Sequence, residues 1–109
     1  MLLSSPLAMN IEQEVTVFFL YGKSQIRPLH QLIDRIRETL LPMKIGELDG
    51  HEIATDLSDG YLFLYGPSAE ALFTAIRPIL NETDFMNKAI VTLRFQDGSD
   101  NTSEYEVTL

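Results

Sequence analysis

The sequence predicts a small α+β domain in which an antiparallel sheet carries two helices on one face. Three observations predict this fold: short apolar strands, two stretches in which apolar residues recur at helical spacing, and turn residues between these elements. The expected element order is β-α-β-β-α-β-β. The first six elements match the split βαβ, or ferredoxin-like, pattern, and the last strand is expected to extend the sheet at the edge beside the fourth. The 109 residues contain no repeat or linker, so we expect one domain over 1–109, with residues 1–13 as an irregular lead-in.

The middle of the chain provides the clearest local signals. Asp59-Gly60 is interpreted as a turn, because glycine takes positive φ without steric cost. The strand 61–65 follows, and its two apolar faces indicate a central position. Ser68 suits the N-cap of the next helix, whereas Pro78 is expected to kink or loosen its last turn. The apolar stripe of this helix consists of Leu72, Phe73, Ile76, Ile79 and Leu80.

The remaining elements follow from the same rules. Residues 14–21 form a second strand that is apolar on both faces, and residues 27–41 form the first helix. The apolar stripe of this first helix consists of Leu29, Leu32, Ile33, Ile36 and Leu40. The acidic stretch 46–55 is typical of an edge strand, with a bulge or bend at its Asp-Gly pair. Residues 89–95 and 104–109 complete the sheet. Since the doubly apolar strands belong in the interior, the predicted strand order is 2-3-1-4-5.

Several short motifs in residues 49–95 have a recognisable spacing, namely Asp59-Gly60, Tyr65-Gly66-Pro67, Arg77-Pro78 and Val91-Thr92-Leu93-Arg94. On these residues the chain resembles a group of small, uncharacterised bacterial proteins of about this length. The similarity covers under half of the chain. It implies the fold only, and it implies no activity, cofactor or site residue.

Composition excludes several classes of function. The formal net charge of -8 repels phosphate backbones, so no nucleic-acid partner is expected. The chain has no cysteine, which excludes disulfides and thiolate metal sites and fits a reducing compartment, the cytoplasm. No apolar run approaches the ~20 residues of a membrane helix, so no membrane partner is expected. A basic protein partner is compatible with the charge.

The sequence contains no recognisable catalytic, cofactor-binding or metal-binding motif. His51 and Glu52 are neighbours in a strand and therefore face opposite sides, and His30 lies on the first helix. Two histidines would ligate a metal only if the fold brought them together with a carboxylate. We expect no catalytic residue, cofactor or metal, and interpret the acidic residues as turn formers and a solvated edge. These acidic residues are Glu47, Asp49, Glu52, Asp56 and Asp59.

The sheet face opposite the helices is the strongest candidate for an interaction site. Alternation places aromatic and aliphatic side chains on it, and so large an apolar patch has to be covered. A second copy of the chain is the preferred cover, and the segment containing Leu2, Leu3, Leu7 and Met9 is the other. The predicted interface consists of Phe18, Leu20, Tyr61, Phe63, Tyr65, Ile90 and Arg94.

Three functions remain open. The preferred one is a non-enzymatic cytoplasmic binding or assembly module that forms a homodimer through the open sheet face. The second is a small acidic inhibitor or immunity-type protein, which would bind a basic protein partner through residues 47–59. The third is a small-ligand binder or enzyme with a pocket at the dimer interface, lined by Tyr61, Tyr65 and Arg94.

Overall fold

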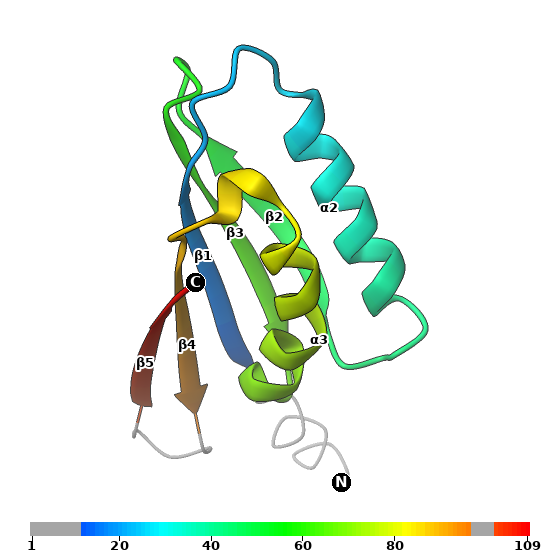
Figure 1. Cartoon of the computed structure of the whole chain (residues 1–109). Helices are drawn as coiled ribbons and strands as arrows, with labels where there is room; N and C mark the ends of the chain where they lie inside the picture. The colour runs from blue at the N-terminus through cyan, green and yellow to red at the C-terminus, as the bar shows by residue number, and fades with distance from the viewer. Residues whose placement is uncertain (1–11, 97–101) are drawn as a thin grey trace, which may run out of the picture.

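The computed structural model describes residues 12–96 and 102–109, which form an α+β fold with a five-stranded antiparallel sheet and two helices (Figure 1). The strand order is β2-β3-β1-β4-β5, the same order that the apolar content of the strands predicts. Element bounds differ from the expected ones by at most two residues. The elements are β1 (Gln13–Leu20), α2 (Arg27–Leu40), β2 (Glu47–Ile53), β3 (Asp59–Gly66), α3 (Ala69–Asn81), the 3-10 turn η1 (Asp84–Met86), β4 (Ile90–Gln96) and β5 (Thr102–Thr108).

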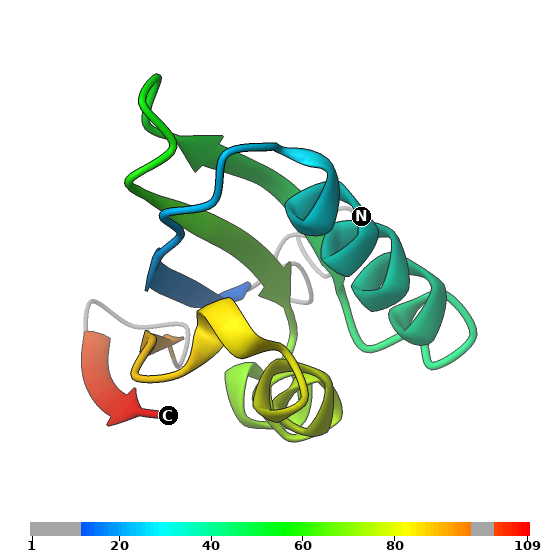
Figure 2. The ribbon, with the colours of Figure 1, turned by 45° about the horizontal axis from the view of Figure 1, so that its top comes forward.

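Both helices lie on the same face of the sheet, as Figure 2 shows. Helix α2 packs beside β2, whereas α3 packs across β1, β3 and β4, and neither helix contacts β5. Each helix buries one apolar stripe because apolar residues recur every three or four positions. All the residues of the two predicted stripes are buried: Leu29, Leu32, Ile33, Ile36 and Leu40 in α2, and Leu72, Phe73, Ile76, Ile79 and Leu80 in α3.

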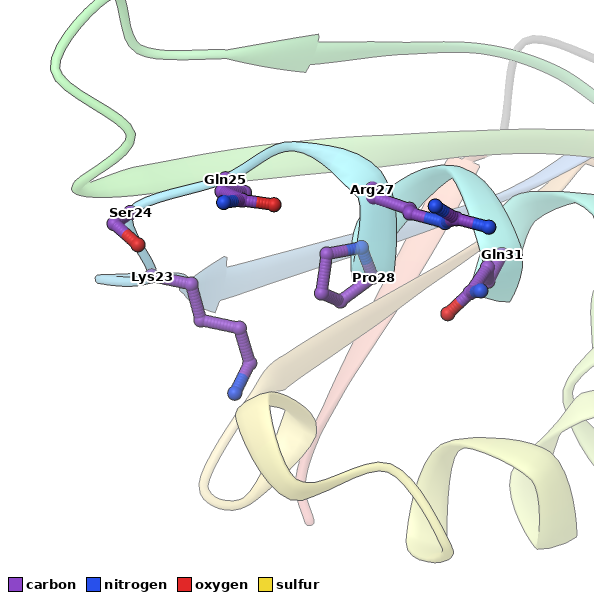
Figure 3. A pocket seen from close by; sticks show the side chains of 6 residues that line it. All are labelled: Lys23, Ser24, Gln25, Arg27, Pro28 and Gln31. Carbon is purple, nitrogen blue, oxygen red and sulfur yellow. The ribbon is translucent and has the colours of Figure 1, made fainter.

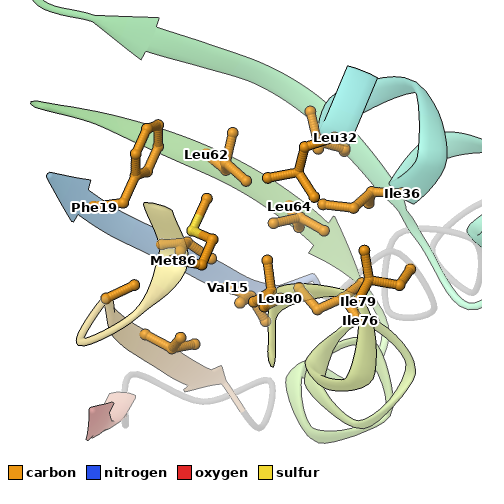
Figure 4. Packing of buried hydrophobic residues seen from close by; sticks show 14 of the residues in the cluster. Val15, Phe19, Leu32, Ile36, Leu62, Leu64, Ile76, Ile79, Leu80 and Met86 are labelled. Atoms are coloured by element: carbon orange, nitrogen blue, oxygen red, sulfur yellow. The ribbon is translucent and has the colours of Figure 1, made fainter. Parts of the chain in front are cut away.

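The core lies between the helices and the covered face of the sheet (Figure 4). Strand β1 contributes Val15, Val17 and Phe19, all fully buried, and β3 contributes Leu62 and Leu64. The turn η1 closes one end of this core with Phe85 and Met86, and the Phe85 ring lies 5.8 Å from that of Phe19.

The predicted turn at Asp59-Gly60 is wrong. Both residues belong to β3 and pair with Leu20 and Phe19 of β1. The chain reverses earlier, where Leu57 takes a positive φ of 63°. Gly60 is required for space, because a Cβ there would lie 2.5 Å from the Glu52 carbonyl oxygen. A glycine can therefore mark close approach of two strands as well as a turn.

The two helix-end predictions have different outcomes. Ser68 is the N-cap of α3, and its hydroxyl accepts a 3.1 Å hydrogen bond from the Ala71 amide. Pro78 lies inside α3, which continues to Asn81, and the kink or loosening expected of the last turn stays a prediction. The bulge predicted in the acidic edge strand is present, where the β2–β3 register shifts between Leu48 and Gly50.

Neither α2 nor α3 is long and apolar enough to cross a membrane. The N-terminal segment with Leu2, Leu3, Leu7 and Met9, proposed above as a cover for the sheet, lies outside the described residues.

Candidate functional site

The open face of the sheet consists of side chains that the strand register aligns in rows across all five strands. The first row is Glu52, Tyr61, Phe18, Ile90 and Thr108. The second row is Gly50, Phe63, Thr16, Thr92 and Glu106. The third row is Glu47, Tyr65, Glu14, Arg94 and Glu104. On the three central strands, β3, β1 and β4, the face thus changes from apolar to ionic.

The apolar end of the open face consists of Phe18, Leu20, Tyr61, Phe63 and Ile90. The Tyr61 ring lies 5.1 Å from the Phe18 ring and stacks on the Phe63 ring at 5.9 Å. Such contacts hold aromatic side chains in place without burying them. Leu20 and Tyr61 remain 70% and 39% exposed, whereas the other three are partly buried. These five side chains form an apolar cluster on the open face of the sheet.

The ionic end of the open face consists of Glu14, Arg94 and Glu104. The Arg94 guanidinium binds both carboxylates, with Nη1 2.8 Å from Glu14 and Nη2 2.8 Å from Glu104. Hydrogen bonding to Glu104, and then the charge of Glu14, raise the pKa of Arg94. The pKa of the nearby Tyr65 hydroxyl is also raised, first by burial and then by Glu14. Arg94 is therefore neutralised within the sheet and is not a free cation for phosphate.

The predicted interface residues all lie on the open face, but they divide between its two ends. Phe18, Leu20, Tyr61, Phe63 and Ile90 form the apolar end, whereas Tyr65 and Arg94 belong to the ionic row. Tyr61 and Tyr65 are four residues apart in one strand, hence about 13 Å. Phe63 lies between them, so the three residues of the suggested ligand pocket do not converge. A hollow of ≈ 430 Å³ beside Tyr61 is lined instead by Glu52, Ile53, Ala54, Asp59 and Gly60.

A histidine pair is one arrangement that the sequence did not predict. The His30 ring on α2 and the His51 ring on β2 lie 6.0 Å apart in an edge-to-face arrangement. Partial burial, then the charges of His30 and Arg37, lower the pKa of His51. Within the described ranges no three His, Cys, Asp or Glu residues are grouped to hold a metal ion. The pair therefore lacks the carboxylate partner that a metal site would need.

The acidic residues of the β2–β3 hairpin do not form one cluster. Asp56 accepts a 3.0 Å hydrogen bond from the Ser58 amide, and its bonds to Ser58 lower its pKa. This is the Asx geometry of a turn former. Asp59 lies in β3 opposite Leu20. Glu47, Asp49 and Glu52 are exposed along β2, as expected of a solvated edge.

A polar hollow of ≈ 450 Å³ lies at the beginning of α2 (Figure 3). It is lined by Lys23, Ser24, Gln25, Arg27, Pro28 and Gln31. Lys23 reaches across to η1, where its Nζ pairs with Asp84 at 3.1 Å. The described part of the chain contains no buried polar side chain that could select a ligand in this hollow. The open sheet face therefore remains the best candidate site.

Compared with known protein families, curated proteins and solved structures, the chain matches none of them.

Proposed function

We propose that this protein is a non-enzymatic binding or assembly module that self-associates through the apolar end of its open sheet face. As part of this proposal, we assign its first six elements to the ferredoxin-like split βαβ arrangement. The supporting observation is the separation of apolar and ionic side chains along one face. The absence of cysteine fits a cytoplasmic location.

The division of the face explains how two acidic chains could associate. In a two-fold contact the same patch meets itself, so Phe63 and Tyr61 of one copy would pack on those of the other. If the axis passes through the apolar end, the two ionic ends fall on opposite sides of the contact. Repulsion between two chains of charge -8 is screened beyond ~8 Å at physiological salt. Burial of apolar area is then the main favourable term.

The substitution Phe63→Glu tests this proposal. It places a carboxylate within the apolar end, beside the Tyr61 ring, where burial of an unpaired charge opposes association. We expect a folded monomer by circular dichroism and sedimentation equilibrium, whereas the wild-type chain dimerises. Higher salt should tighten the wild-type dimer, because it screens the net charge.

Gln96→Glu is the matched control, since it adds the same charge to an exposed residue of the same face beyond the ionic row. It should leave the dimer intact. A wild-type chain that stays monomeric at high micromolar concentration and moderate salt would remove the proposal.

The alternative is an acidic inhibitor or immunity-type protein that binds a basic protein partner. The three exposed carboxylates of β2, namely Glu47, Asp49 and Glu52, support it. Such binding would weaken as salt rises, because exposed charges are screened. Self-association through the apolar end has the opposite salt dependence, so one salt titration separates the two functions.

A further inference from the structure

Strand β5 (Thr102–Thr108) forms one edge of the sheet and is exposed along most of its length. It pairs with β4 in unbroken register from Ile90↔Thr108 to Gln96↔Thr102. Within residues 12–96 and 102–109, no strand pairs with its outer side. Residues 102–106 are all exposed. An edge of this kind offers a row of unpaired backbone groups to another extended chain.

The other edge of the sheet is protected by its shape. The bulge between Leu48 and Gly50 breaks the register of β2, which disrupts a regular template for strand addition. Strand β5 has no bulge, and its sequence TSEYEVT contains no proline, glycine or lysine. Bulges, prolines and lysines are among the usual devices against strand addition, and the charges of Glu104 and Glu106 make β5 receptive only to a strand that complements them.

The hydrogen bonds at the end of β5 show which of its amides point outward. The Leu109 amide donates to the Ala89 carbonyl at 2.9 Å, so Leu109 faces β4. Successive residues of an antiparallel strand alternate in the side to which their backbone groups point. The outward amides and carbonyls of β5 therefore belong to Thr102, Glu104, Glu106 and Thr108.

The side chains of β5 define what kind of strand would fit. Glu104 and Glu106 lie on the open face of the sheet, where Glu104 binds Arg94. Glu106 forms no ion pair with any residue that the structure describes. Tyr105 lies on the opposite face, where it is 68% exposed and its ring is 6.0 Å from that of Phe95. The strand therefore presents carboxylates on one face and the exposed Tyr105 ring on the other.

A second copy of β5 would be a poor partner. An antiparallel β5–β5 contact centred on Tyr105 would place Glu104 directly opposite Glu106 of the other copy, twice. Like charges directly opposite across two strands are destabilising. A strand with lysine or arginine at those positions would instead form opposite-charge pairs.

We propose that β5 is a docking edge for an extended basic segment of another polypeptide, which adds antiparallel as a sixth strand. Lysine or arginine at alternate positions would pair with Glu104 and Glu106, and the apolar residue between them would pack on Tyr105. Main-chain hydrogen bonds supply affinity in this mode, and alternate side chains supply specificity. This inference does not rest on self-association, because it uses the edge of the sheet rather than its open face.

The test uses the full chain and the blocked peptide acetyl-Thr-Lys-Val-Lys-Val-Lys-Thr-amide. Titration followed by NMR should give saturable shifts in β5, and amide exchange should slow at Glu104 and Glu106. Two peptides are controls. In one, each lysine is replaced by glutamate. In the other, the backbone nitrogen of each lysine carries a methyl group. Neither should bind, because the first repels the carboxylates and the second lacks the amide donors that face β5. Equal binding of the N-methylated peptide would overturn the proposal, since it would show charge attraction without strand addition.

Two protein variants locate the site. Glu106→Lys should weaken peptide binding about fivefold or more, because it replaces a cross-strand attraction by a repulsion. Glu52→Lys makes the same change at an exposed position on the opposite edge and should leave binding unchanged. Phe63→Glu should also leave it unchanged, so failure of the dimer and failure of this inference are distinguishable. The assignment would be overturned if Glu106→Lys and Glu52→Lys lost the same peptide affinity. It would also be overturned if the β5 amides became protected from exchange as the concentration of the chain rose without peptide.

Discussion

The two faces of the sheet carry the same kinds of residue, but these residues have different roles on each face. Phe18 and Phe19 are neighbours in β1, yet Phe19 is fully buried under the helices whereas Phe18 stays partly exposed on the open face. Leu62 and Tyr61 show the same contrast in β3. The difference teaches that apolar character in a strand does not by itself mean core. On the covered face it stabilises the fold, and on the open face it creates a surface available for contact.

The faces also differ in how their polar groups are distributed. The covered face and its helices bury no polar or charged side chain among the described residues. The open face carries an ion-paired group at one end, where Arg94 lies between Glu14 and Glu104, and further carboxylates at its edges, on Glu52 and Glu106. Substitutions on the covered face should therefore change stability, whereas those on the open face should mainly change association.

The largest expected difference in stability is between phenylalanine-to-alanine substitutions on the two sides of the sheet. Phe73 of α3 is 7% exposed in the core, and Phe73→Ala should cost ~3–5 kcal/mol by lost transfer energy and a cavity. Phe63→Ala, on the open face, should cost about 1 kcal/mol. Urea unfolding, at concentrations that keep the chain monomeric, measures both. Equal losses would contradict the distinction between the faces.

A smaller effect is expected from adding one methyl group to a glycine on each face. In Gly60→Ala the new Cβ would meet the Glu52 carbonyl at 2.5 Å and the Phe19 ring at 3.0 Å, a clash expected to cost ~1–3 kcal/mol. Gly50→Ala has open space around the Cβ and should stay within ~0.5 kcal/mol of wild type. Thermal unfolding of the two variants measures both effects. If Gly60→Ala left the stability unchanged, β2 and β3 would be able to separate at this point.

The smallest effect concerns His51, at the margin between α2 and β2. Its pKa is lowered from 6.5 in the folded chain, so the unfolded state binds the proton more readily. The contribution to stability is complete above pH ~6.5 and is lost as pH falls through the folded pKa. His51→Gln should therefore flatten the loss of stability between pH ~7 and ~5.

His30→Gln is the companion variant for the histidine pair. It should move the pKa of His51 back toward its ordinary value, as seen by NMR titration, because the His30 charge contributes to the shift. An unchanged His51 titration would mean that the two rings do not interact in solution.

Local sequence determined the elements and the faces on which their side chains lie. Alternation along β1 and β3 assigns Phe19 and Leu62 to one face and Phe18 and Tyr61 to the other, because successive strand residues point to opposite sides. Helical spacing likewise determines the buried stripes, and the hydroxyl of Ser68 determines where α3 begins. Each of these depends on residues that are close in the chain.

Only the tertiary structure decided the features that depend on residues far apart in sequence. Gly60 looked like a turn residue, but contact with the Glu52 carbonyl explains it. Arg94 was predicted as an interface residue, and strand register places Glu14 and Glu104 on either side of it. The meeting of His30 with His51 depends on how α2 packs beside β2. Periodicity reports which face a side chain occupies, whereas register and packing decide which side chains it meets there.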